Sequence, residues 1–207
     1  MSAILTRRRS RAPAFLTTDP LATGFRFTVE RYHELGESGV LSETDRIELI
    51  DGWVVEKPMQ NPPHFNAVIL LNEQLPRVVP NTFAIRIQGP ITLSTSEPEP
   101  DAVVAIGPAS RYREGHPTAK DVALVVEASD SSLEIDRGTK LLIYAAARIP
   151  VYWIVNIPDD RIEVYTDPRA GKHPTYRSRT DFLRGQKIPV VLNGTRVGEI
   201  NVNDILP

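Results

Sequence analysis

The chain has 207 residues, of which 41% are hydrophobic and 24% are charged, a composition that suits one soluble globular domain with a sizeable core. No apolar run approaches the roughly 20 residues that span a bilayer, so a membrane protein is not expected. The chain contains no cysteine, which excludes disulfides and thiolate metal ligands. Any metal must be held by carboxylate, histidine or backbone oxygen.

The formal charge of −2 is unevenly distributed along the chain. Residues 1–12 carry four arginines and no acid, whereas the remainder has 20 basic and 26 acidic residues, a net charge of −6. A net negative charge over residues 13–207 argues against strong non-specific DNA binding, which usually needs a basic excess. It still allows an enzyme that binds DNA through one local basic patch. Residues 1–24 are expected to form a flexible basic arm, with a targeting peptide as the alternative. Because no apolar signal core follows the arginines, we expect a cytoplasmic protein.

The first predicted elements are a short helix and a hairpin. Thr28 is a suitable N-cap for a helix over VERYHELGES. Asp51-Gly52 is a two-residue turn signal between flanks in which apolar residues alternate. Residues 46–50 and 53–56 should therefore pair as a β-hairpin.

Longer apolar segments follow. Two prolines precede a segment with helical spacing, which predicts a helix from about residue 63 to 78. The segment from 131 to 148 is also predicted to be helical, with Ser131 and Glu134 as a capping box. Continuous β-branched runs are typical of strands that are buried on both faces. The predicted strands are FAIRIQGPITLS with a break at Gly89-Pro90, AVVAI, VALVVEAS, VYWIVNI and RIEVYTD, the last two forming a hairpin.

The tail is polar at first and then contains a hairpin around Asn193-Gly194. The order of elements predicts an α/β fold with a central mixed β-sheet flanked by helices, plus a C-terminal β-hairpin extension. We expect one domain over residues 25–167, with residues 168–207 as a β extension packed on it.

Three residues are candidates for a catalytic group. Asp101 opens a buried strand in SEPEPDAVVAI, Glu127 closes the strand VALVVE, and Lys140 lies on the following helix. If the strands are neighbours, the two acids meet at one edge of the sheet, where the prolines before Asp101 cannot join a β ladder. Paired carboxylates with a backbone carbonyl suit Mg²⁺ or Mn²⁺ rather than zinc. Such an ion could polarise a phosphate and activate water, and Lys140 could stabilise the developing charge. The alternative is that the acids are solvated loop residues and the lysine a surface residue.

Other polar residues are weaker candidates. His64, at a helix start, could contact a phosphate or carry a proton, although a simple polar helix-entry role is favoured. Tyr144 is placed to share a helix face with the lysine, or it could be a packing residue. Gln88, on the strand before the acid-bearing one, could touch the substrate. Glu97 and Glu99 are expected to face solvent in an extended, proline-rich segment.

Several motifs together resemble a known family. RIELIDGWVVEKP, EPDAVVAI, VVEASD followed by DRGTKLLIYA, and IPVYWIVNIPDDRIEVY occur in the order found in the Uma-two family. Its members are described as "putative restriction endonucleases" and belong to the PD-(D/E)XK nuclease superfamily. The resemblance extends over residues 27–167.

The resemblance implies a restriction-endonuclease-like core and a ligand set. Pro100-Asp101 would be the PD pair, Glu127 the second acid, and Glu48 an additional carboxylate near the metal. The superfamily places a lysine two residues after the second acid, where this chain has Ser129. In the resembling family the lysine comes from the following helix, which here would be Lys140.

These observations lead to the hypothesis of a Mg²⁺- or Mn²⁺-dependent DNA endonuclease. The absence of HExxH, Walker, GxSxG and dinucleotide-binding motifs removes the commonest rival enzyme classes. Cleavage of both strands calls for two active sites, so a homodimer is expected, and the tail hairpin could build its interface. The alternatives are a non-catalytic nuclease-fold module that binds nucleic acid or protein, favoured by Ser129 and the acidic body, and a metal-dependent phosphoesterase with a non-DNA substrate.

Overall fold

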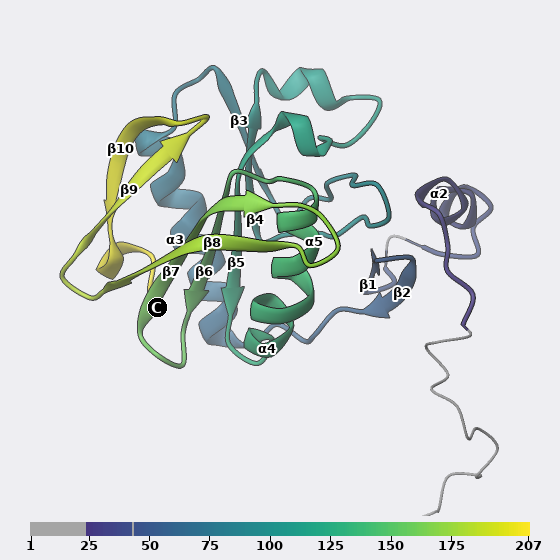
Figure 1. Ribbon diagram of the computed structural model, residues 1–207, viewed down its shortest axis with the longest axis horizontal. Coiled ribbons are helices and arrows are strands. Elements are labelled where there is room, and N and C mark those ends of the chain that lie inside the picture. Colours follow the sequence, from purple (N-terminus) through teal and green to yellow (C-terminus); the bar gives the residue numbers. More distant parts are fainter. Residues whose placement is uncertain (1–23, 43) are drawn as a thin grey trace, which may run out of the picture.

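A six-stranded mixed sheet forms the centre of the computed structural model, which describes residues 24–42 and 44–207 (Figure 1). The predicted arm, apart from Gly24, lies outside these residues. Only β5 and β6 run parallel, and the other neighbours are antiparallel. The strands in sheet order are β3 (Phe83–Ile87), β4 (Ala102–Ile106), β5 (Val122–Ser129), β6 (Val151–Asn156), β7 (Arg161–Arg169) and β8 (Thr175–Leu183). The predicted mixed α/β architecture is confirmed.

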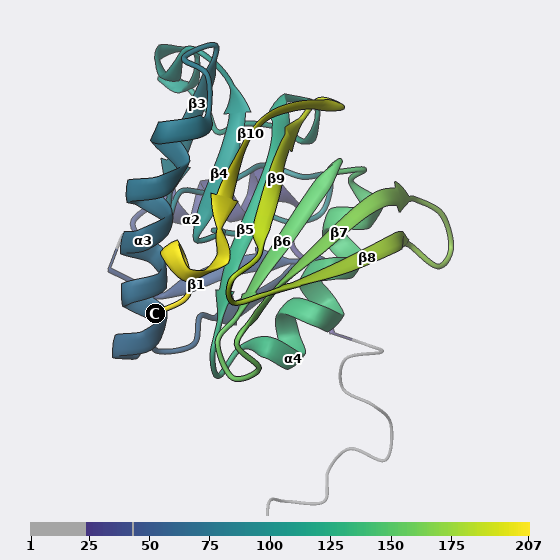
Figure 2. The ribbon, with the colours of Figure 1, turned by 90° about the vertical axis from the view of Figure 1, so that its left-hand side faces the viewer.

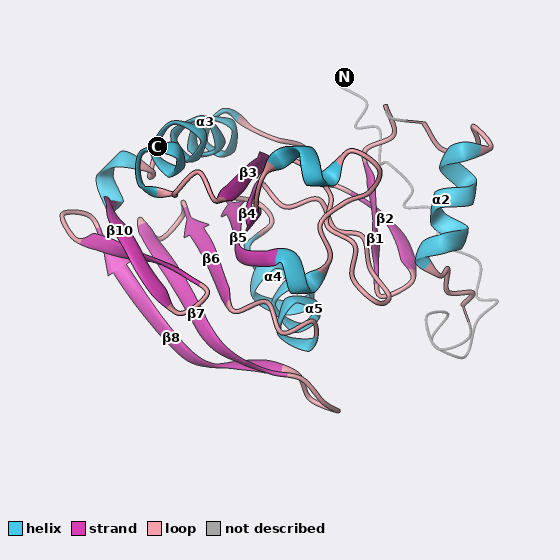
Figure 3. Ribbon diagram, turned by 90° about the horizontal axis from the view of Figure 1, so that it is seen from above, coloured by secondary structure: helices cyan, strands magenta, loops and turns pink. Residues whose placement is uncertain are grey.

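Successive residues of the central strands are divided between two apolar layers. Val104, Val126 and Trp153 pack on the side covered by α3 (Pro62–Val78) and by a second hairpin of β9 (Lys187–Leu192) and β10 (Thr195–Asn201). Their neighbours Val103 and Val125 pack on the side of α5 (Leu141–Ala146). Figures 2 and 3 show α3 and the α4–α5 segment on opposite faces of the sheet. This arrangement explains why AVVAI and VALVVEAS read as continuous apolar runs.

The predicted N-terminal helix and hairpin are confirmed. Helix α2 (Val29–Glu37) begins at Thr28, whose side chain accepts the N–H of Arg31. Strands β1 (Ile47–Ile50) and β2 (Trp53–Glu56) pair through a turn in which Asp51 and Gly52 both have positive φ, as a type I′ turn requires. Both elements lie beside the end of the main sheet, at the right of Figure 1.

The predicted helix over 131–148 is interrupted. It consists of α4 (Leu133–Ile135), a π turn (Asp136–Lys140) and α5. The predicted capping box is wrong because the N-cap is Ser132, not Ser131. The Ser132 hydroxyl donates to Oδ2 of Asp136 at 2.6 Å and caps no backbone N–H.

The tail contributes more than the predicted hairpin. The β9–β10 hairpin is confirmed, with its turn at Asn193-Gly194. Strand β8 was not predicted, and β7 continues to Arg169, past the expected boundary at residue 168. Ile188 and Ile200 of the hairpin are buried in the same apolar cluster as α3, so this apolar face is covered by the chain itself. The domain division stays a prediction.

Short 3₁₀ turns complete the described elements. Their ranges are Ala109–Tyr112, Ala119–Asp121 and Val202–Asp204. Among the helices of residues 24–42 and 44–207, none combines the length and the apolar character needed to cross a membrane.

Candidate functional site

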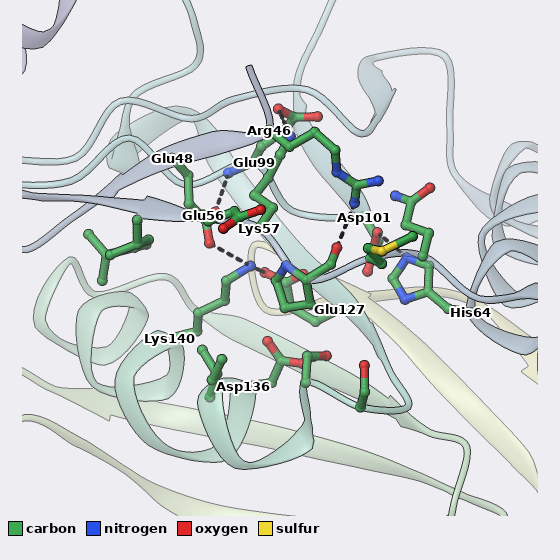
Figure 4. Close-up of a pocket in the computed structure, with 18 of the residues that line it drawn as sticks. Arg46, Glu48, Glu56, Lys57, His64, Glu99, Asp101, Glu127, Asp136 and Lys140 are labelled. Atoms are coloured by element: carbon green, nitrogen blue, oxygen red, sulfur yellow. Dashed lines mark hydrogen bonds and ion pairs between the residues drawn. The ribbon is translucent and has the colours of Figure 1, made fainter. Parts of the chain in front are cut away.

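A pocket of about 480 Å³ lies where the β1–β2 hairpin, the start of α3, the ends of β4 and β5, and the π turn meet (Figure 4). The hairpin and the π turn contribute opposite walls, and the sheet contributes the floor. Its charged and ionisable lining residues are Arg46, Glu48, Glu56, Lys57, His64, Glu99, Asp101, Glu127, Asp136 and Lys140.

Asp101 and Glu127 meet at the end of two neighbouring strands. Strands β4 and β5 are antiparallel with Ala102 opposite Val126, and one more residue in this register places Asp101 opposite Glu127. Oδ2 of Asp101 accepts the backbone N–H of Ala128 at 2.8 Å. The two acids are 7% and 3% exposed. The expected juxtaposition of the acids at the sheet edge is therefore present.

Glu127 is held by two donors from the helical segment that follows. Nζ of Lys140 lies 3.0 Å from Oε1 of Glu127, and the hydroxyl of Tyr144 donates to the same oxygen at 2.7 Å. Burial raises the pKa of Glu127 well above its ordinary value, an effect that the Lys140 ammonium opposes. Burial alone would lower the pKa of Lys140, but the charges of Glu127, Glu48 and Asp136 outweigh it and raise this pKa. Lys140 therefore remains an ammonium ion.

Glu48 reaches the same ammonium from the β1–β2 hairpin. Its Oε1 lies 3.5 Å from Nζ of Lys140, and its Oε2 accepts the N–H of Glu99 at 3.1 Å. The side chain is 4% exposed. Strand β1 is fixed to the segment before β4 by reciprocal backbone bonds between Leu49 and Glu97. This connection places Glu48 in the pocket, as the family resemblance implies.

His64 and Gln88 both approach Asp101. Nε2 of His64 lies 3.1 Å from Oδ1 of Asp101, and Nε2 of Gln88 lies 3.5 Å from the same oxygen. Asn61 caps α3 by accepting the N–H of His64, so the helix start directs the imidazole to the acid. Burial lowers the pKa of His64, but Asp101, with smaller effects of the Ala128 backbone and Asp136, outweighs burial and the net shift is upward. The backbone of His64 takes part in the helix start, as the favoured interpretation expected, whereas its side chain lies against Asp101 in the pocket.

The expectation that Glu97 and Glu99 face solvent is wrong. Glu97 is 6% exposed; its Oε1 is 2.7 Å from Nε2 of His33, and its Oε2 accepts the Thr92 hydroxyl at 2.8 Å. Glu99 is half-buried and pairs with Lys57 at 2.6 Å. His33 and Lys57 lie far from these acids in sequence, so the local proline-rich pattern could not indicate them.

Asp136 is a site residue that the sequence patterns missed. It is 2% exposed and lines the pocket. Its Oδ2 accepts a hydrogen bond from the hydroxyl of Ser129 at 2.7 Å, so the residue at the usual lysine position is bound to an acid. Burial raises the pKa of Asp136, and the Lys140 charge opposes this. The local sequence pointed to Asp136 only through the nearby Ser131 and Ser132, whose hydroxyls are possible partners for a carboxylate.

The oxygen-rich donor set suits a hard divalent cation by its chemistry. Within residues 24–42 and 44–207, no three His, Asp or Glu side chains are gathered closely enough to hold a metal ion as they stand. A cationic group, the Lys140 ammonium, instead lies between Glu48 and Glu127. The carboxylates therefore converge on a position that already favours positive charge.

Comparison with known proteins identifies the fold. No curated protein matches the chain. A crystal structure titled "putative nuclease belonging to DUF820", from Anabaena variabilis ATCC 29413, is similar with a TM-score of 0.59 and 16% identity. The similarity covers 87% of this chain and 97% of that chain. At this identity the likeness shows the fold, and the predicted restriction-endonuclease-like core is confirmed.

The family follows from the sequence match. The family model Uma2, described as "Putative restriction endonuclease", matches residues 29–197. This range runs from α2 into the beginning of β10 and includes Glu48, Asp101, Glu127 and Lys140. The chain belongs to the Uma2 family of "putative restriction endonucleases".

Proposed function

We propose that this chain is a Mg²⁺- or Mn²⁺-dependent endonuclease that hydrolyses phosphodiester bonds in DNA. The observation that carries the proposal is the convergence of Asp101, Glu127 and Lys140 at one end of a nuclease-fold sheet, in a pocket. An acid opening one strand, an acid on the next and a lysine that reaches the second acid supply the groups that metal-assisted phosphodiester hydrolysis requires.

Asp101, Glu127 and Glu48 would hold the ion. Bound there, a divalent ion supplies neutralising charge at the phosphate and a nucleophilic water near neutral pH. The charge of the pocket supports this assignment. Six carboxylates and three cationic side chains line it, a formal net charge of −3 when every carboxylate is ionised and His64 is neutral. A phosphodiester would be repelled from such a pocket unless a cation entered with it.

Lys140 would stabilise the charge that develops on the phosphate oxygens or orient the attacking water. Tyr144 would fix the rotamer of Glu127 through its 2.7 Å hydrogen bond. His64 and Gln88 would orient Asp101 and could also contact a substrate phosphate from the pocket wall. In each of these roles the side chain acts from a position that the fold defines before substrate arrives.

A second candidate is a nuclease-fold module without catalysis that binds nucleic acid or protein. The observation that favours it is the Lys140 ammonium, which already forms ion pairs with Glu127 and Glu48. Under this alternative the ion pairs would be a structural substitute for a metal.

The substrate and the assembly are part of the proposal. Family membership supports a nucleic-acid substrate, and we propose duplex DNA. Incision of both strands requires two active sites, so we propose a homodimer. Sedimentation at micromolar concentration would measure a dimer mass, and a monomer with full double-strand cleavage would contradict this assembly.

The testing experiment is cleavage of plasmid and oligonucleotide DNA with Mg²⁺ or Mn²⁺, with a chelator control. Asp101→Asn and Glu127→Gln should each abolish cleavage, whereas Glu199→Gln, at a surface ion pair with Lys187, should leave it intact. Calorimetry of Mn²⁺ binding would accompany the assay. Metal binding without DNA cleavage would direct attention to RNA and small phosphodiesters. An absence of both would favour the non-catalytic module.

A further inference from the structure

The helical segment that carries Lys140 is interrupted at Asp136–Lys140 by a π turn. The N–H of Leu141 donates to the carbonyl of Asp136, five residues back instead of four. One additional residue rotates the following side chains by about 100° relative to an uninterrupted α-helix. The directions of Lys140 and Tyr144 toward Glu127 therefore depend on the π turn being maintained.

The local sequence does not by itself stabilise this turn. Gly138 lies in its middle, and a Cβ added there would meet no atom within 4 Å, so the glycine is not required by close packing. Glycine instead weakens a helical segment by roughly 1 kcal/mol relative to alanine. The turn must therefore be held by contacts with the rest of the fold.

The first anchor is Asp136. Its Oδ2 accepts the hydroxyls of Ser129 and Ser132, and its carbonyl accepts the hydroxyl of Tyr152 at 3.1 Å. These contacts fix the beginning of the turn against β5 and β6. The outer side of the π turn is held by the next residue, Arg137.

Arg137 binds Glu163 of β7 in a bidentate manner. Nε of Arg137 is 3.1 Å from both Glu163 carboxylate oxygens, and Nη2 also donates to Oε1. Glu163 is fully buried, at 0% exposed, and it accepts further bonds from Asn156 and Tyr165 at 2.6 Å each. A buried carboxylate with this many donors is held in one position. It is therefore a fixed point to which the turn can be attached.

We propose that Glu163 is a positioning residue for the nuclease reaction: by binding Arg137 it maintains the π turn and so directs Lys140 to Glu127. The inference rests on the proposed function for its catalytic consequence, but its structural part does not. Glu163 lies outside the residues that line the pocket, so its effect on the reaction would pass through Arg137 and the turn.

The experiment compares Glu163→Gln with the wild-type chain by two measurements. Steady-state DNA cleavage in Mn²⁺ should show kcat falling by about tenfold or more, with KM within twofold, because a small displacement of a catalytic group slows the chemical step. Acetic anhydride labelling, followed by peptide mass spectrometry, should show Lys140 reacting roughly threefold faster relative to exposed Lys172, because the turn opens locally. A loss of stability alone would leave kcat and KM of the folded protein unchanged.

Two further variants keep the test decisive. Arg137→Gln removes the same ion pair, together with the 3.3 Å contact between Arg137 and Asp159. It should reproduce both effects, and it replaces Glu163→Gln if that variant does not fold. The double variant should be no worse than Arg137→Gln alone, as expected if Glu163 acts through Arg137. Asp167→Asn, which removes a surface pair with Arg177 on β7 and β8, is the matched control and should change nothing.

Unchanged Lys140 labelling in folded Glu163→Gln and Arg137→Gln would overturn the proposal, whatever happens to kcat. If the wild-type chain cleaves no DNA, the labelling measurement still decides whether Glu163 positions Lys140. Failure of the proposed function and failure of this inference are thus separate results.

Discussion

Nζ of Lys140, at the end of the π turn, lies 3.0 Å from Oε1 of Glu127 on β5. The lysine therefore reaches the acid from a helix, whereas the residue two positions after the acid is Ser129, which bonds Asp136. An ammonium group is supplied to the second acid by a different part of the fold. The missing strand lysine is consequently no obstacle to the proposed chemistry.

Replacing Lys140 with methionine should destabilise the protein. The change leaves Glu127 and Glu48 buried without their counter-charge, and breaking a buried pair in this way costs about 3–5 kcal/mol. Because burial already raises the pKa of Glu127, acid relieves the penalty by protonating it, so the loss should be smaller at low pH than at high pH. Urea unfolding across pH measures this loss. Lys187→Met, at an exposed pair, should cost under about 1 kcal/mol, and an equal loss in both variants would contradict the expectation.

Replacing Tyr144 with phenylalanine should separate stability from activity. The variant loses the 2.7 Å bond to Glu127, worth about 1 kcal/mol, and it frees the carboxylate to rotate. Tyr176→Phe is the matched control, because its hydroxyl donates to the carbonyl of Ile149 away from the pocket. Both variants should show similar losses in thermal unfolding, but only Tyr144→Phe should slow DNA cleavage. Equal cleavage rates would remove Tyr144 from the site.

The strand-borne part of the site was predictable because each acid adjoins a continuous apolar run. Asp101 directly precedes β4, and Glu127 lies two residues before the end of β5; such buried strands are recognised from composition alone. A shared helix face for Lys140 and Tyr144 was also expected from their spacing, although their common contact with Glu127 was not. Both expectations, the buried strands and the shared helix face, depend only on residues that are close together in the sequence.

Contacts between distant segments could not be predicted in this way. Glu97 is buried and contacts His33, which lies 64 residues earlier in the chain, whereas its own sequence context resembles a solvated loop. The π turn depends on Glu163 of β7, which no helical pattern over 131–148 contains. Strand β8 was missed because most of its side chains are exposed, and its place in the sheet comes from backbone bonds to β7.

DNA binding should require a divalent cation. The formal net charge of the pocket is −3 when its carboxylates are ionised and His64 is neutral, and a phosphodiester adds another negative charge. Fluorescence anisotropy with labelled duplex DNA should show weak binding in chelator and stronger binding with Ca²⁺. In Asp101→Asn/Glu127→Gln the net charge falls to −1, so binding in chelator should strengthen and the response to Ca²⁺ should disappear. Tight wild-type binding in chelator would contradict the assignment of these acids to a cation.

Acid should remove the stability that Glu163 contributes. Burial tends to raise the pKa of Glu163, but its bonds with Arg137, Tyr165 and Asn156 outweigh burial and lower this pKa below the ordinary 4.5. A lowered pKa means that the contribution is present above about pH 4.5 and is lost as the pH falls through the folded-state pKa. Urea unfolding should therefore show Glu163→Gln least stable relative to wild type near neutral pH, with the difference shrinking in acid. Asp167→Asn should show a much smaller difference at every pH because its ion pair is half exposed. A wild-type advantage that grew in acid would mean that Glu163 is protonated in the folded protein and cannot hold Arg137 by charge.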